Sequence, residues 1–281
     1  MSQPPVQNGR QLVKELLRQS GLRAKKSFGQ NFFANPARLR EIVDLAGVTA
    51  ANLVVEVGPG MGFLTGMLAA RAAKVLAVEL DRDLAAFLRG QFAASANVEI
   101  VEDDILRFQP PAGPYLIVAN LPYYLSSRFL RRFLAGEVAR PRRIAVMLQR
   151  EVAEKLVAPG SSLLQLSVAA YGEPRIAARF EPRDFQPVPK VHSALVVIEV
   201  APAPRIASPE KAFFSVAHSA FQSPRKMLGK SLRAQNLPPE ALARAFAETG
   251  IDPAARPSTL ALADFDRLAG AIVRIRAEYA A

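Results

Sequence analysis

Cysteine is absent from the 281 residues, and histidine occurs only twice, as His192 and His218. The lack of cysteine excludes disulfide frameworks, thiolate zinc sites and cysteine nucleophiles. Two histidines are too few for a histidine metal centre, so we expect no metal. No G-x-S-x-G segment is present to begin a serine-histidine-aspartate relay. The chemistry of this chain must therefore use other groups.

Long apolar runs are also missing. No run approaches the ~20 residues that span a bilayer. The first ten residues carry Pro, Gln and Asn where a signal peptide would have an apolar stretch. We therefore expect a cytoplasmic protein that does not enter a membrane, and nothing in the sequence requires more than a monomer.

Positive charge is in surplus. Lys and Arg total 36 against 25 Asp and Glu, which gives a formal net charge of +11. Such a surplus favours a polyanionic partner, and a nucleic acid is favoured over a membrane. A generally basic proteome would produce the same surplus. Half of the residues are hydrophobic, so the chain can bury a sizeable core.

Short apolar runs alternate with helical patterns between residues 53 and 200. This alternation predicts an α/β fold with a mostly parallel sheet covered on both faces. The expected strands are Leu53–Val57, Val75–Leu80, Val98–Glu102, Tyr115–Ala119, Ile144–Leu148 and Ala194–Val200, and the expected helices are Phe63–Ala70, Asp83–Phe92, Ser127–Leu134 and Glu151–Val157.

A proline-rich stretch between residues 201 and 210 has the composition of a linker. Residues 211–281 show only helical spacing. We therefore predict two domains: residues 1–203, of which 1–24 form a tail and a short helix, and a small all-helical domain over 204–281.

A glycine-rich turn, Gly58-Pro-Gly-Met-Gly62, follows the first long strand and precedes a helix. It could be a tight corner or the start of an adenosine site, because glycine lets the backbone approach a ligand closely. Glu79 ends the next strand, where it could accept the ribose hydroxyls, and Asp104 follows the third, where it could meet the adenine amino group. Three such features at successive strand ends favour NAD or S-adenosylmethionine as the ligand.

The motif Asn120-Leu-Pro-Tyr123 ends the fourth strand and decides between the two ligands. An adenine amine is a poor nucleophile, because its lone pair is delocalised into the ring. The Asn120 side-chain oxygen and the Leu121 carbonyl can each accept one N–H and direct the lone pair at a methyl group. Pro122 fixes this turn, and Tyr123 can stack on a flipped base. Catalysis would then consist mostly of positioning.

Five motifs in register resemble the ribosomal RNA adenine dimethyltransferase family, and most closely its small-subunit type. They are residues 26–33, Glu56–Gly62, Val78–Asp81, Asn120–Tyr123 and Phe185–Ser193. The resemblance implies a Rossmann-like fold with a seven-stranded, mostly parallel sheet and a C-terminal helical RNA-recognition domain. It further implies S-adenosylmethionine-dependent N6,N6-dimethylation of two adjacent adenosines near the 3′ end of 16S rRNA, on a 30S precursor particle during ribosome biogenesis.

The resemblance also implies roles for single residues. The implied cofactor contacts are Asn31, Phe33, Gly58, Gly60, Glu79, Asp104 and Asn120. Phe185 would sandwich the target base opposite Tyr123. The chain departs from the family pattern at Phe33, Tyr124, His192 and Pro224, which puts details of RNA contact in doubt.

Basic residues gather in two segments. Residues 127–150 hold seven arginines against one acid, and a second group lies in the expected helical domain. We expect these groups to contact phosphates and roughly half of them to touch no RNA. The predicted RNA-binding residues are Arg128, Arg131, Arg132, Arg142, Arg143, Arg225 and Lys226.

Other functions stay open. The same chemistry could act on 23S rRNA, as in the erythromycin-resistance type. A non-catalytic RNA-binding assembly factor or a transcription factor could use this fold. Adenine methylation of DNA is disfavoured because DNA adenine methyltransferases usually have a second proline at the position of Leu121. An NAD dehydrogenase is disfavoured because the glycines have the spacing G-x-G-x-G and not the G-x-G-x-x-G of dinucleotide sites.

Overall fold

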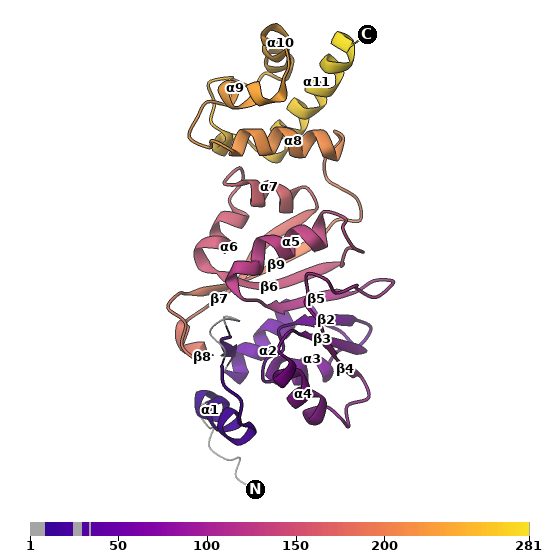
Figure 1. Ribbon diagram of the computed structural model, residues 1–281, viewed down its shortest axis with the longest axis vertical. Coiled ribbons are helices and arrows are strands. Elements are labelled where there is room, and N and C mark those ends of the chain that lie inside the picture. The colour runs from indigo at the N-terminus through magenta and orange to yellow at the C-terminus, as the bar shows by residue number, and fades with distance from the viewer. Residues whose placement is uncertain (1–8, 25–29, 34, 281) are drawn as a thin grey trace. The chain divides into compact units, whose positions relative to one another are not determined.

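The computed structural model describes residues 9–24, 30–33 and 35–280. The main sheet of the described structure has seven strands in the order β4-β3-β2-β5-β6-β9-β7 (Figure 1). The strands are β2 (Leu53–Val57), β3 (Lys74–Glu79), β4 (Val98–Glu102), β5 (Leu116–Asn120), β6 (Arg143–Gln149), β7 (Gly172–Phe180) and β9 (Ser193–Val200). All six expected strands are present, and their ends differ from the predicted ones by no more than one residue.

The first five strands of this order are parallel to one another. β2 pairs with β3 and β5, β3 with β4, and β5 with β6, whereas β9 runs antiparallel to β6. The expected mostly parallel sheet is therefore confirmed. Because parallel strands end at the same edge of a sheet, Val57, Glu79, Glu102 and Asn120 all lie at one edge.

Helix α2 (Pro36–Leu45) precedes β2, and four helices follow strands of the sheet: α3 (Phe63–Ala69), α4 (Arg82–Gln91), α5 (Ser126–Leu134) and α6 (Arg150–Val157). α4 begins where the Asp81 side chain accepts the Asp83 N–H. Buried residues of α2 and α3, among them Leu39 and Leu68, share one apolar cluster with the sheet. This packing covers the sheet and keeps its edge beside the Gly58–Gly62 turn in place.

A small two-stranded sheet was not expected from the sequence. β1 (Phe32–Phe33) pairs antiparallel with β8 (Phe185–Gln186), and α1 (Gly9–Ser20) packs on β8. β7 was not expected either, because only two of its nine residues are buried and its sequence contains no long apolar run. Two-residue strands carry no periodicity, so the pairing of β1 with β8 depends on contacts distant in the sequence.

The described chain divides into two compact units. One contains residues up to Ala153 together with Arg175–Val200, and the other contains Glu154–Pro174 and the residues from Ala201 onward. The second unit contains the end of α6, the start of β7 and five further helices with short 3-10 turns: α7 (Leu163–Ala169), α8 (Glu210–Phe221), α9 (Leu228–Ser231), α10 (Pro239–Thr249) and α11 (Leu262–Ala280). The predicted domain boundary at residue 203 stays a prediction. In the described ranges, no helix combines the length and the apolar character that crossing a membrane requires.

Candidate active site

The glycine turn is held in a conformation that side chains rarely adopt. Gly58, Gly60 and Gly62 have φ angles of +71°, +58° and +79°. A Cβ atom on Gly58 would lie 2.9 Å from the carbonyl oxygen of Asn120, and one on Gly60 would lie 2.7 Å from the Phe32 ring. Glycine is therefore required here, because the turn lies directly against two other parts of the site.

Two predicted carboxylates lie at the ends of neighbouring strands. Glu79 accepts hydrogen bonds from the Gly60 N–H at 3.3 Å and from the Asp81 N–H at 2.9 Å. Burial raises the pKa of Glu79 above its ordinary value. Asp104 accepts the Leu106 N–H at 2.9 Å, which caps the following turn. Glu79 is thus tied to the glycine turn, and both carboxylates face the same cavity.

Asn120 ends β5 beside the glycine turn. Its side-chain Nδ2 donates to the carbonyl oxygen of Asn31 at 3.3 Å. This bond uses the donor end of the amide, so Oδ1 is the atom that can accept an N–H from a substrate. Leu121 is buried, and the Leu125 N–H donates to the Pro122 carbonyl at 3.0 Å. The side chain of Tyr123 lies outside the described part of the structure.

The segment Gln30–Phe33 lines the cavity. The Gln30 side chain donates to Asp81 at 3.1 Å, and the Phe33 ring lies 4.4 Å from the Phe185 ring at a tilt of 49°. Phe185 is 1% exposed and belongs to the apolar core. It therefore forms part of the cavity wall, and its role toward a base stays a prediction.

One cavity brings these elements together. Its lining includes most of the residues predicted for the cofactor and the base: Asn31, Phe33, Gly58, Gly60, Glu79, Asp104, Asn120, Leu121, Pro122 and Phe185. It also includes Phe32, Leu80 and Tyr124, which sequence reasoning missed. Leu80 and Tyr124 are exposed by 49% and 63%. No cluster of three or more metal-binding side chains occurs among the residues that the structure describes.

Glu56 also lines the cavity, and no role was predicted for it. It is 1% exposed, and neither carboxylate oxygen makes a hydrogen bond of good geometry among the described residues. Burial raises its pKa from 4.5 to about 8; the Thr65 hydroxyl lowers the pKa in part, and the charge of Glu79 adds to the rise. A carboxylate inside the apolar strand Leu53–Val57 was the sequence signal that could have identified it. A buried acceptor without a partner at a cavity is typical of a ligand site.

Comparison with known proteins agrees with this geometry. Residues 21–272 match the ribosomal RNA adenine dimethylase family. The chain belongs to this family. It is 39% identical to the ribosomal RNA small subunit methyltransferase A of Pelotomaculum thermopropionicum, over 92% of this chain and 94% of that protein. It is 38% identical to the protein of the same name from Dehalococcoides mccartyi, over 91% of each chain.

A solved structure extends the comparison to the fold. The crystal structure of the 23S rRNA methyltransferase ErmE superposes with a TM-score of 0.71 and 26% identity, over 86% of this chain and all of that one. Together with family membership, this confirms the predicted Rossmann-like fold, the methyltransferase activity and S-adenosylmethionine as the cofactor.

The cavity of this family member fits that cofactor. Gly58 and Gly60 leave no side-chain atoms where the backbone borders the cavity. Glu79 and Asp104 line the cavity, and their roles toward the ribose hydroxyls and the adenine amino group stay predictions. Glu56 offers carboxyl oxygens in the same cavity to a cationic ligand, whose positive charge would favour the ionised form of Glu56. When bound, S-adenosylmethionine supplies an electrophilic methyl group on a positively charged sulfur.

The predicted RNA-binding arginines differ in how free their guanidinium groups are. Arg132 donates to the carbonyl oxygens of Arg107 and Phe108, and Arg143 binds Glu199 and the Ala46 carbonyl. Arg131 lies 3.9 Å from Glu137 and is 70% exposed. Four of the seven predicted residues are exposed and have no ion pair among the described residues: Arg128, Arg142, Arg225 and Lys226. These four are the stronger candidates for phosphate contacts, and the RNA-binding role of the whole set stays a prediction.

Proposed function

We propose that this protein dimethylates N6 of two adjacent adenosines near the 3′ end of 16S rRNA, with S-adenosylmethionine as the methyl donor. We also propose that it acts as a monomer in the cytoplasm, on a 30S precursor particle during ribosome biogenesis. The observation that carries the proposal is the position of Asn120: its amide lies in one cavity with Glu79 and Asp104, and its donor end is already bonded to Asn31.

The chemical role of Asn120 follows from that bond. With Nδ2 held by Asn31, Oδ1 would accept one N–H of the target adenine, and the Leu121 carbonyl would accept the other. Two acceptors favour a pyramidal nitrogen, which turns its lone pair toward the methyl group. The attacking amine is neutral and loses its proton after transfer, so no strong base is needed. Tyr123 would stack on the base, and the wall containing Phe185 would limit its movement.

The similarity of the relatives supports the small subunit as the target. The two relatives named above share more than a third of their residues with this chain and are small-subunit methyltransferases, whereas the 23S enzyme shares about a quarter. The exposed basic residues of α5 support an RNA partner, because phosphate contacts supply affinity and the flipped base supplies specificity.

The test is methyl transfer from labelled S-adenosylmethionine to isolated small and large subunits that lack the modification, followed by mapping of the labelled base. We expect N6,N6-dimethyladenosine at two adjacent positions of 16S rRNA and none in 23S rRNA. Label in 23S rRNA would contradict the proposed substrate. RNA binding without any transfer, in a preparation that binds the cofactor, would favour a non-catalytic assembly factor. The Asn120→Ala variant is the matched control for transfer.

A further inference from the structure

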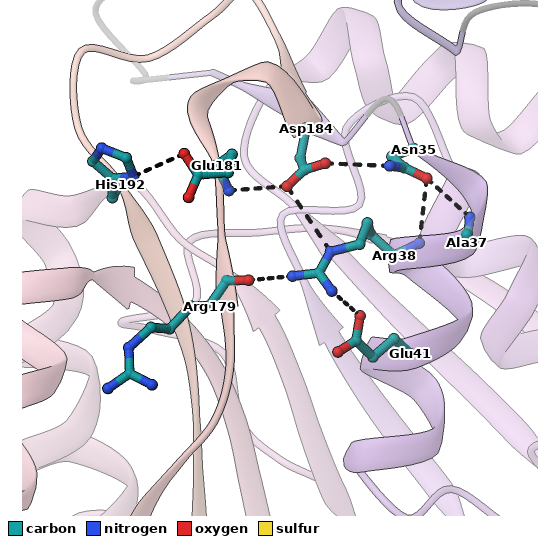
Figure 2. Close-up of polar contacts among 8 residues, drawn as sticks. All are labelled: Asn35, Ala37, Arg38, Glu41, Arg179, Glu181, Asp184 and His192. Atoms are coloured by element: carbon teal, nitrogen blue, oxygen red, sulfur yellow. Dashed lines mark hydrogen bonds and ion pairs between the residues drawn. The ribbon is translucent and has the colours of Figure 1, made fainter.

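A cluster of polar side chains joins two segments of the cavity wall without lining the cavity itself. We call Asn35, Arg38, Glu181 and Asp184 the Asp184 cluster (Figure 2). Asn35 and Arg38 belong to the start of α2, and Glu181 and Asp184 to the turn η3 (Pro182–Asp184) and the residue before it. None of the four lines the cavity.

Asp184 is the centre of this cluster. It is 8% exposed, and its two oxygens have different partners. Oδ1 accepts the Asn35 side-chain N–H at 3.2 Å, and Oδ2 accepts the Glu181 backbone N–H at 2.9 Å. The Arg38 Nε lies 3.9 Å from Oδ2. A single buried carboxylate thus connects the start of α2 with the turn before Phe185.

The second half of the connection is Asn35. Its side-chain oxygen accepts the N–H groups of Ala37 and Arg38 at 3.1 and 3.4 Å, so it is the N-cap of α2. Its nitrogen donates to Asp184. Both ends of one amide are therefore used, and the orientation of the Asn35 side chain is determined by the two sets of bonds together.

Arg38 adds a third contact between the same segments. Its guanidinium binds Glu41 in α2 and the carbonyl oxygen of Arg179 in β7. It also lies over the Phe180 ring, 4.1 Å from the ring centroid. Figure 2 shows the bonds of Arg38 to Glu41 and to the Arg179 carbonyl beside the bonds of Asp184.

The segments that the cluster joins both face the cavity. Two residues before Asn35, Phe33 pairs with Phe185, and Phe32 pairs with Gln186. Phe32 lies against the glycine turn, and Asn31 holds Asn120. A ladder of only two residue pairs is marginal by itself, so additional contacts are needed to hold Gln30–Phe33 and Phe185 in one arrangement.

We propose that Asp184 is a positioning residue. Through its contacts with Asn35 and Arg38, it holds the cofactor-facing segment Gln30–Phe33 and the base-facing wall at Phe185 in one arrangement. Binding of the cofactor to the first segment therefore orders the base site. This deepens the proposed function and rests on it for the assignment of the base site. Coupling between two sites is reciprocal. The cluster must therefore raise cofactor affinity, and the bound cofactor must in turn order residues 181–186.

Two single substitutions break the link in different ways. Asp184→Asn places the amide nitrogen of residue 184 opposite the Asn35 nitrogen, while its oxygen still accepts the Glu181 N–H. Asn35→Asp keeps an oxygen for the cap of α2 but places a carboxylate against Asp184 Oδ1. The double variant Asn35→Asp/Asp184→Asn exchanges donor and acceptor, so the hydrogen bond can form again with both caps retained.

The matched control is Asp266→Asn in the other unit. Like Asp184, Asp266 accepts a hydrogen bond at each carboxylate oxygen, in its case from the backbone N–H groups of Ala207 and Ser208 at 2.9 and 2.8 Å. It tests whether loss of a carboxylate that binds backbone amides is harmful in general. All variants are made in the full chain and are compared by thermal unfolding.

The experiment measures S-adenosylmethionine binding by calorimetry without RNA, and backbone hydrogen exchange with and without the cofactor. For each single variant of the cluster we expect a dissociation constant about 5- to 20-fold higher than wild type, and a loss of cofactor-dependent protection at residues 181–186. Protection at the glycine turn should persist. The double variant should recover affinity and protection, and Asp266→Asn should bind as wild type does.

Wild-type affinity in both single variants would overturn the proposal, as would protection of residues 181–186 in them. A double variant that binds as weakly as the single ones would also overturn it. The proposed function fails separately: a wild-type protein that binds the cofactor and shows the coupling, but leaves 16S rRNA unmethylated, would contradict the substrate assignment and not the role of Asp184.

Discussion

Replacing Glu56 by glutamine should stabilise the ligand-free protein at neutral and alkaline pH and leave its stability unchanged at pH 4. Glu56 is buried without a hydrogen-bond partner among the described residues, and its pKa rises from 4.5 to about 8 on folding. Between these two values the folded state holds a proton that the unfolded state has released. The free energy of unfolding therefore decreases as the pH rises through this window.

The size of the effect follows from the two pKa values. Each pH unit between 4.5 and about 8 lowers the free energy of unfolding by about 1.4 kcal/mol. The total is about 3 kcal/mol at pH 7 and about 5 kcal/mol above pH 8. Below pH 4.5 the carboxyl is protonated in both states and behaves like the amide of glutamine. Glu79, whose pKa is also raised, is present in both proteins, and it cancels in their difference except for its charge interaction with Glu56.

The assay is urea unfolding of wild type and Glu56→Gln at pH 5, 6, 7 and 8. The chain has no tryptophan, so circular dichroism is the suitable signal. Glu154→Gln, at an exposed position of α6, is the control and should show no such trend. The difference between Glu56→Gln and wild type should grow with pH. If the difference in the free energy of unfolding is the same at pH 5 and pH 8, Glu56 does not take up a proton on folding, and burial does not raise its pKa.

Three further predictions concern the site and the RNA surface. Asn120→Ala should reduce single-turnover methyl transfer by about 100- to 1,000-fold, or ~2.7–4 kcal/mol of transition-state stabilisation; turnover near wild type would exclude its acceptor role. Gly58→Ala should lower the free energy of unfolding by about 1–3 kcal/mol, because its φ is +71° and its Cβ would meet the Asn120 carbonyl; urea unfolding at one pH checks this, and an unchanged midpoint would contradict it. RNA affinity should fall linearly with the logarithm of salt concentration, and Arg128→Ala should reduce the slope by about 1. Arg143→Ala should leave the slope unchanged because its guanidinium already binds Glu199; equal slopes for wild type and Arg128→Ala would remove Arg128 from the interface.

The strands and the strand-end motifs could be predicted because buried parallel strands leave continuous apolar runs in the sequence. Leu53–Val57 matches β2 in full, and the carboxylates after the next two strands lie at the edge where parallel pairing requires them. The Asn120 motif was recognisable because its residue types match the chemistry of an adenine amine. Such features are local, so a short window of sequence contains them.

Other features could not be read from the sequence because they depend on distant partners. The pairing of β1 with β8 joins residues more than 150 positions apart over two residue pairs. The guanidinium groups of Arg132 and Arg143 donate hydrogen bonds to backbone carbonyl groups of residues that are distant in the sequence. Among the seven predicted RNA-binding residues, these two have the same side chain as Arg128, and only their surroundings set them apart.

The sequence by itself determined the six apolar strands, the residues that end them and the chemistry that those residues can perform, since hydrophobic periodicity and side-chain type are properties of the chain. Only the tertiary structure decided that Glu56 is buried without a partner, that the Asn120 amide is oriented by Asn31, and that Asp184 joins α2 to the wall at Phe185. Burial and hydrogen bonding depend on which atoms surround a group in space, and residues far apart in the sequence supply those atoms.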